Sequence, residues 1–154
     1  MAGTLQANGL PEIDDDKTKA FGGSGGLVHI QTKNKNVENV LSPERVAIEA
    51  RGGLGMNGGF GGSGGAIVLN GVKREPVELI DEYDFASTIG GIDNDDDLCG
   101  NGAAGIIFNA DTSEAVVDND EVFSTALTFL PLAFHTILVG AGANAVVWKT
   151  QSDL

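Results

Sequence analysis

Short apolar segments separated by glycine-rich stretches dominate this chain. Residues 27–30, 66–69 and 106–108 are each apolar, and the first two are rich in β-branched side chains. No window of about 11 residues has a clean helical period, and glycine or proline interrupts the chain about every ten residues. Short apolar runs of this kind are typical of buried strands. The pattern therefore predicts an all-β chain.

A glycine run precedes each of these apolar segments. The hexapeptide Phe-Gly-Gly-Ser-Gly-Gly occupies residues 21–26 and again residues 60–65, and a third glycine-rich stretch follows at 100–105. The spacing indicates an internal repeat of about 39 residues, present in two and a half to three units. Glycine permits a positive φ and close backbone approach. We therefore expect contacts between subunits at Phe21, Gly22, Gly23, Gly25, Gly26, Phe60, Gly61, Gly62, Gly64 and Gly65.

The C-terminal part of the chain reads as further strands. Residues 115–117 and 122–129 are predicted as strands on either side of an acidic turn at 118–120. Residues 136–139 and 145–148 flank a glycine-rich turn, and this turn content predicts that they form a hairpin.

The length of 154 residues suits one domain. We expect an N-terminal arm at 1–20 and a single β domain at 21–154, divided into glycine-rich repeats (21–112) and C-terminal strands (113–154). The domain is either a glycine-rich β-sandwich or barrel, or a short β-helix-like stack, and a trimer is expected. The predicted core consists of Ile67, Leu69, Ile106, Phe108, Phe129, Phe134, Ile137, Val147 and Trp148.

Composition and charge exclude several classes of function. Nine Lys and Arg against 22 Asp and Glu give a net charge of −13, which repels phosphate backbones and anionic lipids. Nucleic acid and membrane surfaces are therefore not expected partners. Residues 123–148 carry no formal charge, but Pro131 and His135 interrupt them, so they read as core strands rather than a membrane span. A lone cysteine, Cys99, excludes an internal disulfide framework, and without a signal-like N-terminus synthesis in a cytoplasm is expected.

Candidate chemistry is confined to one acidic segment. Asp93, Asp95 and Asp97 alternate as the first ligands of a Ca²⁺ loop do. Leu98 and Ala104 stand where an EF-hand has glycine and a bidentate glutamate, so a solvated acidic loop is favoured over a Ca²⁺ site. A Ca²⁺-dependent hydrolase is the least favoured interpretation of the function, after the two structural roles given below. The expected protein is not an enzyme and has no cofactor.

The nucleophile-elbow pattern Gly-x-Ser-x-Gly is formally matched by residues 22–26 and 61–65. That elbow needs a helix after the serine, whereas here a predicted strand follows. We do not expect a catalytic serine.

Residues 129–148, from Phe-Leu-Pro-Leu-Ala-Phe-His to the final Ala-Val-Val-Trp, resemble the C-terminal strands of small tailed-phage virion proteins. The turn here is Gly-Ala-Gly-Ala rather than the Gly-Thr type of that family. The resemblance implies a non-enzymatic structural part of a virion, either a capsid decoration (cement) protein or a tail or spike-base component. Its implied partners are further copies of the chain and a major capsid or tail protein.

The repeated glycine runs with their strand-like sequels also resemble glycine-rich parallel β-helix regions of surface adhesins and extracellular filament proteins. This second resemblance implies a structural or adhesive role on a cell surface. A short array counts against it, since solenoids need three or more units and caps.

Overall fold

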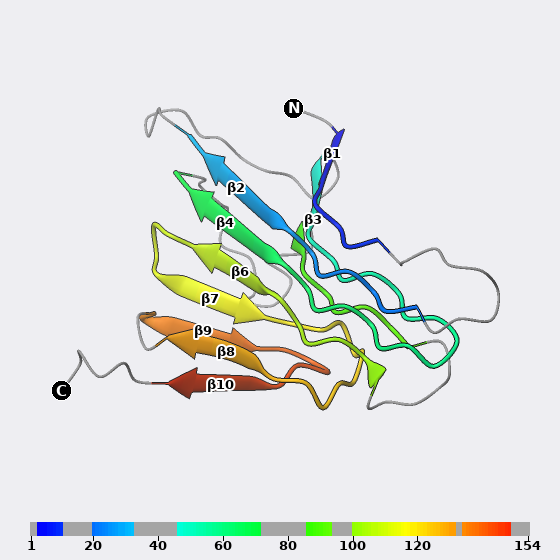
Figure 1. Ribbon diagram of the computed structural model, residues 1–154. Coiled ribbons are helices and arrows are strands. Elements are labelled where there is room, and N and C mark those ends of the chain that lie inside the picture. The colour runs from blue at the N-terminus through cyan, green and yellow to red at the C-terminus, as the bar shows by residue number, and fades with distance from the viewer. Residues whose placement is uncertain are drawn as a thin grey trace.

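The computed structural model describes residues 3–10, 20–32, 46–71, 86–93, 100–131 and 134–148. Ten strands lie within these ranges (Figure 1). They are β1 (Gly3–Gln6), β2 (Leu27–Gln31), β3 (Val46–Glu49), β4 (Ala66–Asn70), β5 (Ala86–Ser87), β6 (Ile106–Asn109), β7 (Glu114–Val117), β8 (Thr128–Pro131), β9 (Thr136–Val139) and β10 (Ala145–Trp148).

The strands form three sheets in which most neighbours are parallel. One sheet has the order β2-β4-β6-β7-β9, a second has the order β1-β3-β5, and β8 pairs with β10. Among these pairs of described strands, only β6–β7 is antiparallel. The all-β prediction is confirmed. A β-sandwich is wrong, because the sheets are built from parallel neighbours rather than from the hairpins typical of sandwiches.

The strand register follows the repeat seen in the sequence. Leu27 of β2 stands opposite Ala66 of β4, and each of these two residues directly follows a copy of the hexapeptide. Ala66 in turn stands opposite Ile106 of β6, which follows the third glycine-rich stretch.

Strands β1, β3 and β5 run toward the glycine runs, and β2, β4 and β6 return from them (Figure 1). One reversal is made by Asn57-Gly58, whose φ angles of 54° and 75° suit a two-residue turn that favours this dipeptide.

The main core lies between the two sheets of the repeat region. Ile48 of β3 and Ile67 of β4 have no exposed surface, and Leu69 is 1% exposed. Ala50, Ala86, Ile107 and Val116 complete this cluster. These strands therefore bury alternate residues, as period-two patterning requires.

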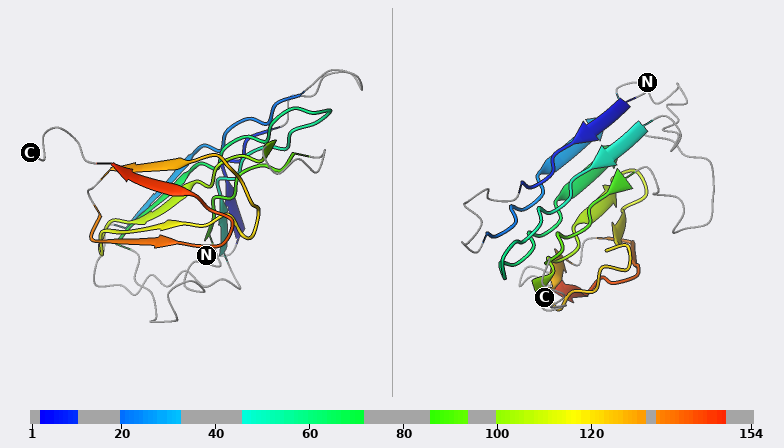
Figure 2. Two further views of the ribbon diagram at one scale, coloured as in Figure 1. Left: turned by 90° about the horizontal axis from the view of Figure 1, so that it is seen from below. Right: turned by 90° about the vertical axis from the view of Figure 1, so that its right-hand side faces the viewer.

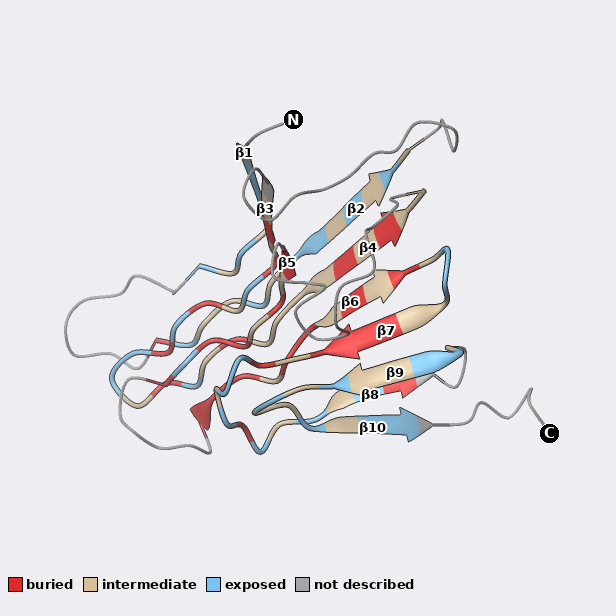
Figure 3. Cartoon of the chain, turned by 180° about the vertical axis from the view of Figure 1, so that it is seen from behind, coloured by how far each residue is buried: buried red, intermediate tan, exposed pale blue. Residues whose placement is uncertain are grey.

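A smaller cluster forms where β8 and β10 meet the five-stranded sheet. Leu130 and Val117 are buried there with Ala104, and Phe134 packs beside them, its ring centroid 5.2 Å from that of Phe108. Figure 3 shows β7 largely buried between its neighbours while β10 remains mostly exposed.

Several C-terminal predictions are wrong. Residues 136–139 and 145–148 do not form a hairpin, because β9 pairs with β7 and β10 pairs with β8. Residues 122–127 are not strand, and β8 begins at Thr128. Phe129, predicted in the core, is 66% exposed, because β8 turns the neighbouring Leu130 inward. Val147, also predicted in the core, stands opposite Leu130 but is 44% exposed, because β10 pairs only with β8 among the described strands.

The N-terminal segment also enters the sheets. Residues 3–6, which the sequence placed in an arm, form β1 and pair in parallel with β3. Residues 7–10 of the predicted arm continue from β1, and residues 1–2 and 11–19 lie outside the described residues.

Candidate functional site

The glycine runs gather into one body beyond the strands, which we call the glycine bundle (Figure 1). Its lower layer continues from β1, β3 and β5, and its upper layer leads into β2, β4 and β6. The lower layer consists of residues 7–10, 50–55 and 88–92, and the upper layer of residues 21–26, 60–65 and 100–105.

Hydrogen bonds within each layer recur at every third residue. In the upper layer the Gly22 N–H donates to Phe60 O at 2.9 Å, and the Gly25 N–H donates to Ser63 O at 2.9 Å. A three-residue repeat with no bonds inside a run is the property of a polyproline II helix. The same spacing recurs in the other hydrogen bonds of each layer. In the upper layer the N–H groups of Gly61 and Gly64 donate to Gly100 O and Ala103 O, and in the lower layer those of Gly52 and Gly55 donate to Ile89 O and Ile92 O.

A second set of bonds joins the two layers. The Gly62 N–H donates to Gly53 O at 2.9 Å, and the Gly65 N–H donates to Ala50 O at 2.6 Å. Each run is thus held by its neighbour in the layer and by a run in the other layer. Four further N–H groups of the upper layer donate to carbonyl oxygens of the lower layer in the same way: Gly23 to Leu10 O, Gly26 to Ala7 O, Gly102 to Gly91 O and Gly105 to Thr88 O.

Close packing explains why glycine is needed here. A Cβ atom on Gly62 would lie 2.1 Å from Gly23 O, and one on Gly102 would lie 2.0 Å from Gly62 O. Such distances are far inside contact, so a side chain would separate the runs. Left-handed backbone is not the reason, because the described glycines with positive φ are Gly58, Gly71 and Gly142, all outside the bundle runs.

The predicted contact glycines therefore all lie in the bundle, and the close backbone approach occurs within one chain. Whether these residues also contact another subunit stays a prediction. The sequence pattern missed the lower layer, although Gly52, Gly53 and Gly55 already show the same three-residue spacing.

Every third residue of a run points away from the bundle and has room for a side chain. On the upper layer the Phe21 and Phe60 rings lie with centroids 6.0 Å apart, and Ser63 Oγ donates to Ser24 Oγ at 3.0 Å. Both phenylalanines are at least half exposed. The repeat therefore displays like side chains in rows on this outer surface.

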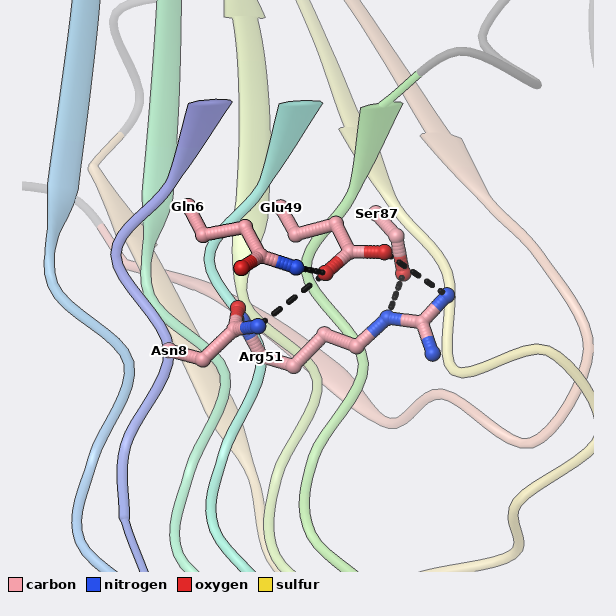
Figure 4. Close-up of polar contacts among 5 residues, drawn as sticks. All are labelled: Gln6, Asn8, Glu49, Arg51 and Ser87. Atoms are coloured by element: carbon pink, nitrogen blue, oxygen red, sulfur yellow. Dashed lines mark hydrogen bonds and ion pairs between the residues drawn. The ribbon is translucent and has the colours of Figure 1, made fainter. Parts of the chain in front are cut away.

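A polar row lies instead where β1, β3 and β5 pass into the lower layer (Figure 4). Glu49 Oε2 accepts hydrogen bonds from Gln6 Nε2 at 2.7 Å and from Asn8 Nδ2 at 3.0 Å. An Arg51 guanidinium nitrogen lies 3.9 Å from Glu49 Oε1, and Arg51 Nε donates to Ser87 Oγ at 3.0 Å. Gln6, Glu49 and Ser87 share one register position across β1, β3 and β5.

This row lowers the pKa of the Glu49 carboxyl. The largest cause is the hydrogen bond from Asn8, which is opposed by partial burial and supported by Gln6 and by the charge of Arg51. The sequence pattern gave no sign of the row, because its members come from three segments far apart along the chain. Only the strand register could have revealed it.

An open groove crosses the junction between the upper layer and its strands. It is lined by residues 25–27, 63–66 and 103–106, with Leu127 and Thr128 at one side. The lining consists of glycine, alanine, serine, threonine, leucine and isoleucine, so it offers no acid, base or metal ligand.

The predicted acidic site is only partly within the described residues. Asp93 is buried, and its N–H donates to Asn101 Oδ1 at 2.8 Å. Asp95 and Asp97 lie outside the described residues. Among the described residues no group of three His, Cys, Asp or Glu side chains is placed to hold a metal ion. The Ca²⁺ hypothesis stays a prediction.

Large apolar side chains are exposed at the end of the bundle farthest from the strands, which we call the apolar tip. Its residues lie at the far ends of both layers and in the turn between them: Leu10 (78% exposed), Phe21, Leu54, Met56, Phe60 (58%) and Ile92. The Phe21 and Phe60 rings form an exposed aromatic pair with centroids 6.0 Å apart, and exposed apolar surface is typical of interaction sites in soluble proteins.

Comparison with known proteins identifies no relative. The chain matches no family model, no curated protein and no solved structure. Within the described ranges, no helix has the length and apolar character that a membrane crossing requires. The function must therefore be argued from the geometry of the chain itself.

Proposed function

We propose that this chain is a non-enzymatic structural protein of a phage particle, which decorates and reinforces the capsid shell or forms part of the tail. The observation that carries the proposal is the glycine bundle, in which hydrogen bonds tie each run to its neighbours in and between the layers. A bundle held in two directions is a stiff support rather than a flexible linker. Such rigidity is expected of a protein that reinforces a larger assembly.

The apolar tip supports an assembly role. Six large hydrophobic side chains that are 42–78% exposed would favour burial against another subunit. The net charge of −13 would keep such a subunit away from packaged nucleic acid. We propose a homotrimer as the working unit, made in the host cytoplasm and built into the virion beside a major capsid or tail protein.

A cell-surface adhesin or filament protein is the second candidate. It is favoured by the parallel pairing of successive repeats, in which β2, β4 and β6 lie side by side with equivalent residues in register. That arrangement can in principle be extended by further repeats, as in solenoids.

Immunogold labelling separates the two candidates. An antibody raised against the purified chain would be applied to phage particles and to cells from the source. Label on capsids or tails is the expected result. Label on intact cell surfaces together with unlabelled particles would overturn the virion proposal in favour of the adhesin.

Light scattering tests the oligomer. The absolute mass of the purified chain would be measured at several concentrations, with and without chelator. A mass near that of three chains in both conditions is expected. A concentration-independent monomer would contradict the trimer, and a mass that changes with chelator would point instead to bound Ca²⁺.

A further inference from the structure

Among the described residues, one side of the upper layer has no neighbouring run. Residues 21–26 and 60–65 have the same sequence, and in the second copy Phe60 O and Ser63 O accept hydrogen bonds from the first copy. The equivalent acceptors in the first copy are Phe21 O and Ser24 O, and no N–H among the described residues donates to them. Figure 2 shows the first run, in blue, at the outer edge of the stack.

The same edge continues into the sheet. Strand β2 is terminal in the order β2-β4-β6-β7-β9. Its inward-facing Val28 and Ile30 are only half-buried, whereas Ile67 and Leu69 opposite them on β4 are completely buried. An edge strand with unused backbone groups is a template for pairing with another chain.

Glycine occupies two positions at this edge, 23 and 26, where a Cβ atom would have more room than at the equivalent positions 62 and 65. A Cβ on Gly65 would lie 2.0 Å from Gly26 O, but a Cβ on the equivalent Gly26 would meet nothing nearer than Ala7 Cβ at 3.2 Å. Gly62 and Gly23 differ in the same way: a Cβ on Gly62 would lie 2.1 Å from its nearest atom, and a Cβ on Gly23 would lie 3.0 Å from its nearest atom. Gly23 and Gly26 therefore provide the close approach that a further run on the open side would require.

We propose that this open edge binds an extended glycine-rich segment of a partner polypeptide. The segment would run parallel to residues 21–31, with glycine at two of every three positions, and would continue as a strand beside β2. Its N–H groups would donate to Phe21 O and Ser24 O. This binding site rests on the proposed structural function, because it specifies the kind of partner to which the structural protein would attach.

A second copy of the chain is not the occupant. The N–H groups with the required spacing, on Gly22, Gly25, Gly61 and Gly64, already donate within the chain. Another copy could offer them only by opening its own bundle. The partner is therefore a different polypeptide with an unpaired glycine run.

The test uses the chain's own sequence as a probe. Residues 21–26 donate hydrogen bonds to residues 60–65, and the missing run would donate to residues 21–26 in the same way. The probe is therefore a fluorescent peptide with the sequence of residues 21–31 and two added lysines for solubility. Its binding to the full chain would be followed by fluorescence anisotropy. The control peptide carries N-methylglycine at the positions of Gly22 and Gly25, which removes the two donors.

Saturable binding of the probe is expected, with binding at least about tenfold weaker for the N-methylated peptide. The variant Gly26→Ala should also weaken binding at least about tenfold, because its Cβ would meet the incoming backbone as a Cβ on Gly65 would meet Gly26 O. The matched variant Ser63→Ala, on the outward row of the neighbouring run, should bind normally. Melting temperatures of both variants would confirm that the fold is intact.

Absence of probe binding would overturn the inference, as would equal binding of the N-methylated peptide or of Gly26→Ala. Immunogold labelling of particles would be unaffected by such a failure. A failure of this docking site is therefore distinguishable from a failure of the virion proposal.

Discussion

Replacing Gly62 by alanine tests the interlocking of the bundle most directly. The new Cβ would lie 2.1 Å from Gly23 O and 2.6 Å from Gly22 O, both backbone atoms. Ordinary contact begins at 3.4 Å, so the neighbouring run must move by about 1.3 Å. Gly23 O accepts a 2.8 Å hydrogen bond from the Gly53 N–H, and Gly53 O accepts a 2.9 Å bond from the Gly62 N–H. A displacement of this size disrupts both bonds.

The cost follows from these two effects. Overpacking in a closely packed site costs about 1–3 kcal/mol. Each lost backbone hydrogen bond adds about 1 kcal/mol. We therefore expect Gly62→Ala to lower the free energy of unfolding by about 3–5 kcal/mol, which is a large part of the ~5–15 kcal/mol typical of a domain.

The matched control is Gly26→Ala. Its nearest neighbour would be a side-chain methyl at 3.2 Å, and the loss of backbone freedom in the unfolded chain favours alanine by about 0.4–1 kcal/mol. Its stability should stay within about 1 kcal/mol of the wild type. Urea unfolding followed by circular dichroism measures both variants. If Gly62→Ala costs no more than Gly26→Ala, the runs are not interlocked as described.

Four further substitutions test three other parts of the structure. Glu49→Gln should be less stable than the wild type at pH 7, because the pKa of Glu49 in the folded protein lies below its ordinary 4.5; the difference in melting temperature should shrink as the pH falls through the folded-state pKa, and a difference that does not change with pH would contradict this. Asn119→Ala should cost about 2–4 kcal/mol in urea unfolding, since Gly90 N–H and Val122 O lose a buried partner, and a cost below about 1 kcal/mol would contradict this. Leu130→Ala should cost about 2–4 kcal/mol, whereas its exposed neighbour Phe129→Ala should cost under about 1 kcal/mol, and similar values for the two would refute the assigned orientation of β8.

Sequence alone determined three strands of the repeat region and the spacing between them. Local patterning encodes strand formation, so residues 27–30, 66–69 and 106–108 were recognisable as strands. The spacing between the two identical hexapeptides then matched the offset between β2 and β4. Close approach at the glycines was also predictable, because residues without Cβ atoms permit it at any site.

Only the tertiary structure decided what the glycines approach and which strands become partners. The lower layer faces the upper one through backbone bonds such as Gly62 N–H to Gly53 O, which no side-chain pattern encodes. Strands β9 and β10 are neighbours in sequence but join different sheets, and Ile137 of β9 and Ala145 of β10 both pack against the buried cluster that contains Val117 and Leu130. Turn content indicates where a chain can reverse, but strand pairing depends on packing between segments far apart in sequence. For the same reason Phe129 is exposed and the row around Glu49 exists only in the fold.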